Sequence, residues 1–180
     1  MSHQSNIRRL IFASMMAAVV YVASAFLQLS IPTAIGTTRI HLGNVMCLLS
    51  GMLLGPVYGG VAAGVGSMLF DLTSPVYISS APFTFIFKFA MAWLCGKIVK
   101  KRPDQFGFIF GSIAGAFLYT LLYITKNFVE YCFVFSMPLE GVLLMSMQKG
   151  IVSCINAVLS VAIAVPLGSS LRPIIKRFLL

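Results

Sequence analysis

Residues 39–72 read RIHLGNVMCLLSGMLLGPVYGGVAAGVGSMLFDL, an apolar stretch that is interrupted once, at Gly55 and Pro56. Because proline breaks a helix, the stretch divides into two helical pieces of about 15 and 16 residues, each about 23 Å long at 1.5 Å per residue. Each piece is shorter than the hydrocarbon core of a membrane, which is about 30 Å thick. Glycines recur at four-residue spacing, which lets helices approach closely within lipid. The stretch therefore predicts two short, tightly packed membrane helices.

The composition of the whole chain indicates a membrane protein. Of its 180 residues, 59% are hydrophobic and 9% are charged, and the mean hydropathy is +0.97. Four more apolar stretches are long enough to cross a membrane, at 10–29, 81–99, 106–128 and 142–167. We therefore predict an all-α membrane protein with six transmembrane helices in a single domain, residues 1–180. The two short pieces can also form a re-entrant hairpin, but lipid tolerates half-depth backbone only where protein or water covers it, which favours six spans.

Nine of the thirteen basic residues gather in three clusters that flank apolar stretches. The clusters are Arg8 and Arg9; Lys97, Lys100, Lys101 and Arg102; and Arg172, Lys176 and Arg177. Basic residues near the ends of membrane helices stay in the cytoplasm. Both termini and the loop at 97–106 are therefore expected inside, in a multi-pass protein of a bacterial cell membrane. The clusters also explain the net charge of +9, so we expect no nucleic-acid partner.

The other four basic residues and three of the four acidic ones fall in the predicted outer half of the protein. Ionisable side chains within a membrane are costly and usually functional. The near balance predicts ion pairs, for example Asp71 with Lys88 or Glu130 with Lys149. One unpaired base would suit a carboxylate or phosphate ligand, and complete pairing would suit a neutral heterocycle. We predict a ligand pocket there, formed or supported by Arg39, His41, Asn44, Asp71, Lys88, Asn127, Glu130 and Lys149.

Further polar and aromatic residues are candidates for the same predicted pocket. His41 and Asn44 are expected to share a helical face, so they would point into the same space. Tyr119, Tyr123 and one of Phe83 or Phe85 are candidates to stack on an aromatic ligand. Asn156 lies near the predicted middle of the membrane, either as a packing hydrogen bond or as a ligand-binding group.

Several classes of protein are disfavoured by what the sequence lacks. Its four cysteines are isolated, which argues against a zinc site or a thiol oxidoreductase. It has no GxxxxGK[ST] motif for ATP, no HExxH, and no GxSxG with a helical histidine. We therefore expect no enzyme activity, no metal, no cofactor and no ATP site in this chain itself.

The ordered motifs resemble those of a known family. These motifs are IHLGN (40–44), LLGPxxGG (53–60), a glycine before a closing DL as GxxxxDL (66–72), and APxTFIxK (81–88). Together with the length, six expected helices and cytoplasmic termini, they are similar to the S components of energy-coupling factor (ECF) vitamin transporters. The nearest resemblance is to the branch that includes riboflavin, hydroxymethylpyrimidine and pyridoxine types.

The resemblance implies a mechanism and partners. Such proteins capture a vitamin at the outer face, then topple in the membrane when they dock on a transmembrane coupling subunit with two ATPase subunits. An AxxxA pattern marks the docking face of the first helix, and Ala13 and Ala17 match it. The resemblance favours hydroxymethylpyrimidine or pyridoxine as ligand, then riboflavin, then folate. The alternative is a stand-alone secondary transporter or channel acting as a homo-oligomer, although the two halves lack the matching broken helices of an inverted repeat.

Overall fold

The computed structural model describes residues 3–32 and 37–179. This part of the chain contains six α-helices and one antiparallel hairpin of two strands. The helices are α1 (His3–Phe26), α2 (Gly43–Leu54), α3 (Pro56–Thr73), α4 (Ala81–Lys101), α5 (Gln105–Val129) and α6 (Leu139–Leu179). The strands are β1 (Gln28–Pro32) and β2 (Thr37–His41). A 3₁₀ turn (Ile78–Ser80) precedes α4, and a π-helical turn (Glu130–Val134) extends α5.

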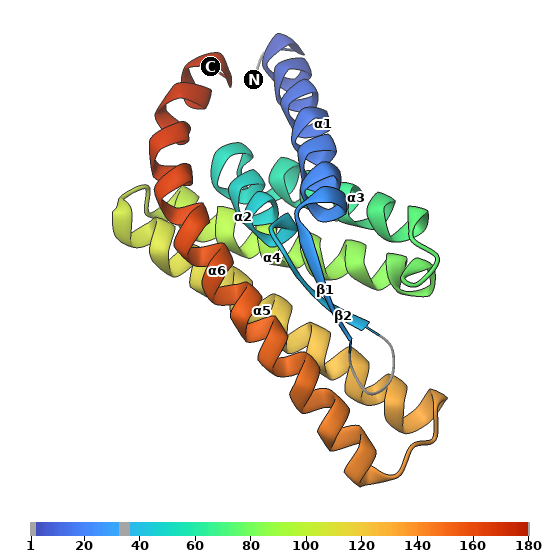
Figure 1. The fold of residues 1–180 in the computed structure, drawn as a ribbon. Coiled ribbons are helices and arrows are strands. Elements are labelled where there is room, and N and C mark those ends of the chain that lie inside the picture. The colour runs from blue at the N-terminus through green and yellow to red at the C-terminus, as the bar shows by residue number, and fades with distance from the viewer. Residues whose placement is uncertain (1–2, 33–36, 180) are drawn as a thin grey trace.

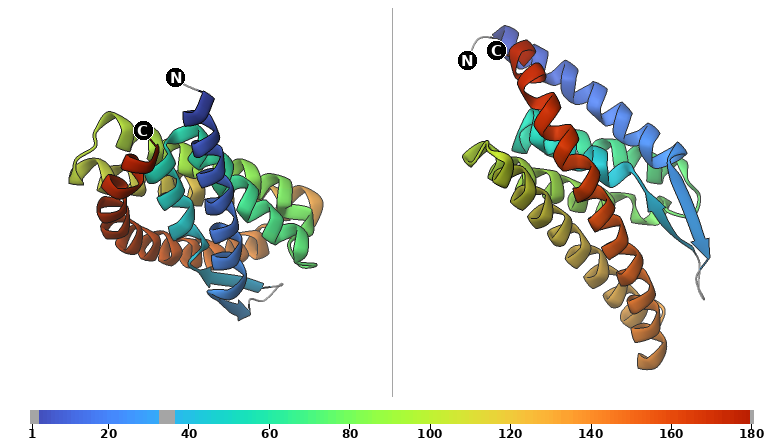
Figure 2. Two further views of the ribbon diagram at one scale, coloured as in Figure 1. Left: turned by 90° about the horizontal axis from the view of Figure 1, so that it is seen from above. Right: turned by 60° about the vertical axis from the view of Figure 1, so that its left-hand side comes forward.

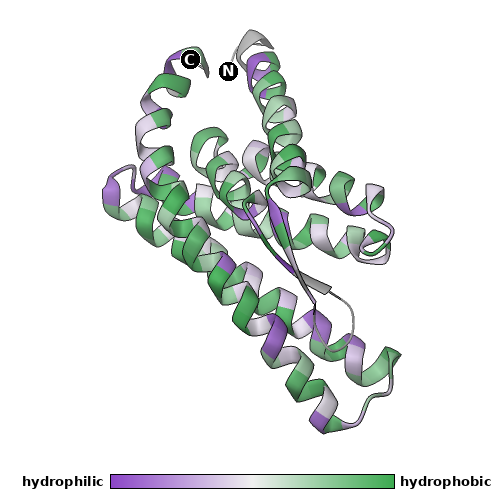
Figure 3. Ribbon diagram, in the orientation of Figure 1, coloured by the Kyte–Doolittle hydropathy of each residue, from purple (hydrophilic) through white to green (hydrophobic). Residues whose placement is uncertain are grey.

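Four helical segments have the length and hydropathy needed to cross a membrane: Asn6–Phe26, Ile78–Lys101, Gln105–Val134 and Leu139–Ile175. Apolar residues cover most of the ribbon, and hydrophilic ones gather at the helix ends, on the hairpin and on the lower parts of α5 and α6 (Figure 3). The expectation of an all-α membrane protein is thus confirmed. The cytoplasmic orientation of the termini and the presence of six transmembrane helices remain predictions.

Helix α2 lies in the middle of the molecule, between α1, α3, α4 and α6 (Figure 1). It has twelve residues, and eleven of them are buried. Because protein surrounds it, this helix can stop short of a full membrane crossing without exposing its ends to lipid. The break predicted at Gly55 and Pro56 is present, since Gly55 has a φ of 80° and Pro56 begins α3.

The molecule has two distinct ends. Both termini and the α4–α5 turn point toward one end, whereas the hairpin and the α5–α6 connection point toward the other (Figure 2, right). The three basic clusters belong to the first of these, which we call the basic end. This arrangement agrees with the prediction that the three basic clusters lie on the same side of the membrane.

The hairpin is the main departure from the expected fold. The first membrane helix was expected to run to residue 29, with a loop over 30–38, but α1 ends at Phe26 and residues 28–32 pair with 37–41. Likewise, α6 continues twelve residues beyond the expected end at 167, with Pro166 and Pro173 inside it. Each proline removes one backbone hydrogen bond of α6, and its ring crowds the carbonyl four residues earlier, which favours a bend in the helix.

Close packing of α2 on α4 depends on Gly51. A Cβ atom at this position would lie 2.3 Å from the backbone oxygen of Ala92. We expect Gly51→Ala to lower the free energy of unfolding by about 1–3 kcal/mol, because the two helices must separate. Thermal unfolding in detergent measures this effect. Gly150→Ala is the matched control, since its Cβ would meet only Ile124 Cδ1 at 3.4 Å; equal losses in both variants would contradict the prediction.

Candidate ligand-binding site

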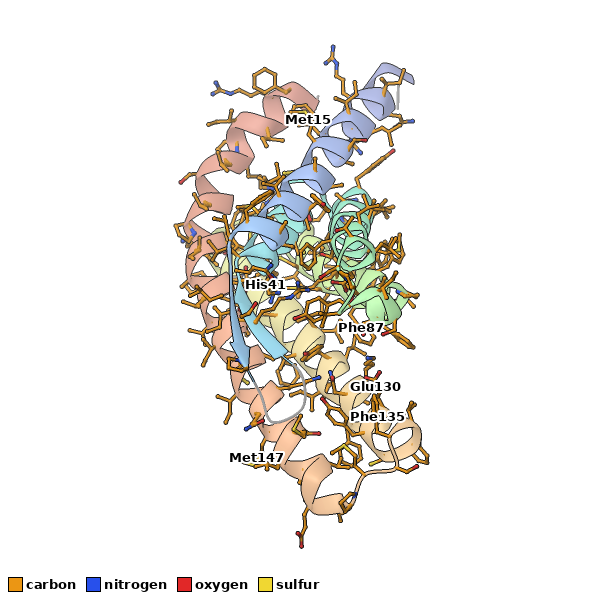
Figure 4. All side chains as sticks on the ribbon, turned by 45° about the vertical axis from the view of Figure 1, so that its right-hand side comes forward. Met15, His41, Phe87, Glu130, Phe135 and Met147 are labelled. Atoms are coloured by element: carbon orange, nitrogen blue, oxygen red, sulfur yellow. The ribbon has the colours of Figure 1, made fainter. Side chains whose placement is uncertain are left out.

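A cavity of about 480 Å³ lies among the hairpin, α3, α4, α5 and α6. Its lining comes from the first half of α4, the second half of α5 and the first half of α6, which places it away from the basic end. Eight aromatic rings contribute to its wall: Phe70, Tyr77, Phe83, Phe87, Tyr119, Tyr123, Tyr131 and Phe135. Figure 4 shows His41 deep among the helices, and Glu130 and Phe135 nearer the α5–α6 connection. The cavity therefore combines an aromatic wall with buried polar groups.

An ion pair fastens the hairpin to α3. The Arg39 side chain in β2 donates from Nη2 to Asp71 Oδ1 at 3.0 Å, and only 4% of the Asp71 side chain is exposed. The Arg39 guanidinium also lies between the rings of Phe70 and Tyr77, at 4.2 Å and 4.0 Å from their centroids. The second carboxylate oxygen of Asp71 accepts a hydrogen bond from Thr84 of α4. Hairpin, α3 and α4 thus meet at one carboxylate.

Asn156 fastens the same strand to α6. Its Oδ1 accepts from the backbone N–H of His41 at 3.0 Å, and its Nδ2 donates to the backbone oxygen of Arg39 at 2.8 Å. Residues 39 and 41 point to the same side of a strand, and both line the cavity. The packing and ligand-binding interpretations of Asn156 are therefore compatible, because Asn156 lines the cavity and also sets the position of two lining residues.

Lys88 is a buried cation at the deep part of the site. Its side chain is on α4, the residue is 3% exposed, and Nζ donates to Asn44 Oδ1. Nζ also lies 3.6 Å from the centroid of the Tyr119 ring. His41 is in β2 rather than on the helix that holds Asn44, so the expectation of a shared helical face was wrong. Both residues nevertheless lie near this part of the cavity, His41 on its wall and Asn44 behind Lys88.

The part of the site nearer the α5–α6 connection holds two more lysines. Lys126 Nζ donates to Glu130 Oε2 at 2.5 Å and to Ser80 Oγ at 3.2 Å. Lys149 Nζ donates to Asn127 Oδ1 at 2.8 Å and lies 5.0 Å from the centroid of the Tyr131 ring. The expected pairs were therefore wrong, because Asp71 binds Arg39 instead of Lys88, and Glu130 binds Lys126 instead of Lys149.

The structure brings the candidate site residues together. Seven of the eight line the cavity, namely Arg39, His41, Asp71, Lys88, Asn127, Glu130 and Lys149, and Asn44 contacts Lys88. Phe83 lines it and Phe85 does not. Sequence reasoning missed Thr84, Phe70 and Tyr77. The APxTF motif contains Thr84 and could have indicated it, but nothing in the sequence marks the two rings.

The site offers hydrogen bonds, charge and ring stacking, which are suited to binding. Within residues 3–32 and 37–179, no three His, Cys, Asp or Glu side chains are placed to hold a metal ion. Tyr119 and Tyr123 stack on each other with centroids 5.9 Å apart along α5. Aromatic rings and polar groups together are suited to contact a small aromatic molecule through its face and its polar edges.

Comparison with known proteins identifies the family. Residues 4–173 match the family model described as the S component of ECF-type riboflavin transporters. The chain belongs to this family. The resemblance drawn from the motifs is thereby confirmed, and the protein is a transport subunit of the membrane. The S component is also 30% identical over 112 residues to a Pyrococcus woesei protein described as an uncharacterized protein in the gap 3′ region, covering 62% of this chain and 73% of that one.

Removal of the buried cation tests whether the S component uses this cavity. We expect Lys88→Ala to weaken ligand binding by more than tenfold, or about 1.4 kcal/mol. The variant removes the ammonium group expected to contact the ligand, and it leaves Asn44 without its hydrogen-bond donor. Isothermal titration of the purified protein measures the change. Lys100→Ala, at the exposed end of α4, is the control. Unchanged affinity in Lys88→Ala would assign Lys88 a structural role.

Proposed function

We propose that this S component captures a small aromatic vitamin at the outer face of the cell membrane and delivers it to an ECF transmembrane coupling subunit that works with two ATPase subunits. The observation that carries the proposal is the cavity, which joins stacked tyrosines to buried polar and charged groups in a membrane protein of this family. The proposal includes six spans, cytoplasmic termini and a pocket that opens on the outer side.

Riboflavin is the ligand we favour among the candidates. The description of the family names riboflavin transporters. A cavity of about 480 Å³ falls in the range of roughly 300–1,000 Å³ that suits drug-sized ligands. Such a volume suits a multi-ring vitamin better than the single rings of hydroxymethylpyrimidine and pyridoxine. Folate is the next candidate.

A second hollow supports the proposed docking on a coupling subunit. It lies between α1 and α3, has a volume of about 560 Å³ and is lined almost entirely by apolar and small side chains, among them Ala13 and Ala17. Neighbouring backbones approach closely here, since a Cβ atom on Gly66 would lie 2.3 Å from the Ala17 oxygen. A helix of a partner can approach such a small-residue surface within lipid.

The first experiment is mass spectrometry of small molecules released from the detergent-purified S component, beside a mock purification. We expect one vitamin in near-stoichiometric amount, and its loss from a purified Lys149→Met variant that is still folded. A protein that is empty, and that binds none of riboflavin, folate, pyridoxine or hydroxymethylpyrimidine on titration, would contradict the proposed ligand class. Uptake that needs no ATPase partner would favour a stand-alone transporter.

A further inference from the structure

The charges around the cavity do not cancel. Four basic side chains line it, Arg39, Lys88, Lys126 and Lys149, but only two acidic ones. Asp71 binds Arg39 and Thr84, and Glu130 binds Lys126. Lys88 and Lys149 therefore have no carboxylate within ion-pair distance among the described residues.

The other acidic residues of the chain cannot neutralise these lysines. The whole sequence has four Asp and Glu residues. Asp104 pairs with Arg102 in the α4–α5 turn, at the basic end, and also accepts from the backbone N–H of Gly107. Glu140 is exposed at the start of α6 and forms no ion pair within the described part of the chain. The excess of two positive charges is thus a property of the cavity itself.

Each of the two lysines is held by a neutral group. Lys88 donates to Asn44 and Lys149 donates to Asn127, so in both cases an amide oxygen stands where a carboxylate would complete an ion pair. An ammonium group has three donors, and each lysine keeps donors for a further acceptor. His41 Nδ1, on the same wall, is buried and has no hydrogen-bond partner among the described residues.

The two lysines contact α5 at positions about two helical turns apart. Lys88 lies over the Tyr119 ring, and Lys149 binds Asn127, eight residues further along α5. Eight residues of helix correspond to about 12 Å. A planar ligand that lies beside Tyr119 and Tyr123 in the cavity would therefore have one uncompensated ammonium group near each end.

We propose that the natural ligand of this site carries an acidic group, a carboxylate or a phosphate monoester, attached to its aromatic ring system. A buried cation that lacks a counter-ion, as Lys88 does, is unfavourable in a membrane protein, and the half-buried Lys149 lacks one as well. An anionic ligand supplies the missing charge. The inference rests on the proposed function, and it narrows the substrate class from aromatic vitamins to their acidic forms. Among flavins it therefore favours an acidic derivative over uncharged riboflavin itself.

Two pairs of flavins test this inference, each pair differing by one acidic group. Riboflavin is compared with riboflavin 5′-phosphate, and 7,8,10-trimethylisoalloxazine with its 10-carboxymethyl analogue. Quenching of flavin fluorescence gives the dissociation constant of each. We expect the acidic member of at least one pair to bind at least tenfold more tightly, and the pair that shows the preference identifies phosphate or carboxylate as the group recognised.

The lysines are tested through the acid preference, which is the dissociation constant of the neutral flavin divided by that of its acidic partner. This ratio is measured within one protein, so a loss of folded material does not change it. We expect Lys149→Met or Lys88→Met to reduce the acid preference at least tenfold, and Lys149→Arg and Lys88→Arg to retain most of it. Lys100→Met, which removes one exposed charge at the basic end, should leave it unchanged. Neutral flavins that bind as tightly as the acidic ones, or a preference unchanged in both methionine variants, would overturn the inference and leave the proposed function intact. No binding of any of the four flavins would instead overturn the proposed flavin ligand.

Discussion

Replacement of Asp71 by alanine is expected to weaken ligand binding by at least a hundredfold. The carboxylate joins β2 to α3 and α4 through Arg39 and Thr84, and its side chain is almost completely buried. Removal of one partner from a buried ion pair typically costs about 3–5 kcal/mol, because the other charge stays buried and unpaired. Arg39 would then be free to leave the Phe70 and Tyr77 rings, and the hairpin wall of the cavity would lose its attachment. Titration of the favoured ligand gives the affinity.

The matched control for this variant is Asp104→Ala, which removes an exposed carboxylate that is also paired with an arginine. Its affinity should equal that of the unmodified protein. A second variant, Arg39→Leu combined with Asp71→Ala, removes both charges and should bind more tightly than Asp71→Ala alone if the unpaired arginine causes the loss. Wild-type affinity in Asp71→Ala would show that the ion pair does not hold the hairpin in the binding state.

Replacement of both Ala13 and Ala17 by leucine is expected to abolish uptake and leave ligand binding intact. Both residues line the hollow between α1 and α3, and two additional isobutyl groups would fill the space that a partner helix needs. The cavity for the ligand is lined by other residues, so its affinity should change by less than about twofold (about 0.4 kcal/mol). Vitamin uptake by cells that also express the coupling and ATPase subunits measures the first effect, and titration of the purified variant measures the second.

Val19→Phe provides a control for added bulk on the same helix. Val19 is 43% exposed and does not line the hollow. Uptake should persist in this variant. Because Ala13 is itself only 5% exposed, the double variant is also checked by thermal unfolding before binding is compared. Normal uptake in a folded double variant, or loss of ligand binding in it, would contradict the assignment of this surface to docking.

The helices that carry strong local signals were predicted closely. Helix α4 was expected over 81–99 and extends over Ala81–Lys101, with Pro82 in its first turn. Helix α5 was expected over 106–128 and extends over Gln105–Val129, where Asp104 accepts from Gly107 N–H as the N-cap. Proline in the first turn and an aspartate cap act within one turn of the helix, so the sequence alone contains the information that fixes these ends.

The hairpin and the ion pairs could not be predicted in the same way. Residues 28–32 and 37–41 form only two short strands, and a two-stranded hairpin is marginal unless other elements hold it. Here the supports are Asp71 and Asn156, which lie 32 and 117 residues along the chain from Arg39. The partner of each lysine likewise depends on how the helices are rotated and shifted against one another. Composition indicates that buried charges need polar partners, but tertiary contacts decide which groups serve as those partners.

The attachment of β2 through Asn156 also bears on how this protein can diverge in evolution. Asn156 binds the backbone oxygen of residue 39 and the backbone N–H of residue 41. Every amino acid has this oxygen, and every amino acid except proline has this N–H. The side chains at these two positions can therefore be exchanged without loss of this anchor. A lineage that keeps the asparagine on α6 can therefore change the side chain at position 41 while the strand stays attached, whereas a change at position 39 also requires a compensating change at Asp71.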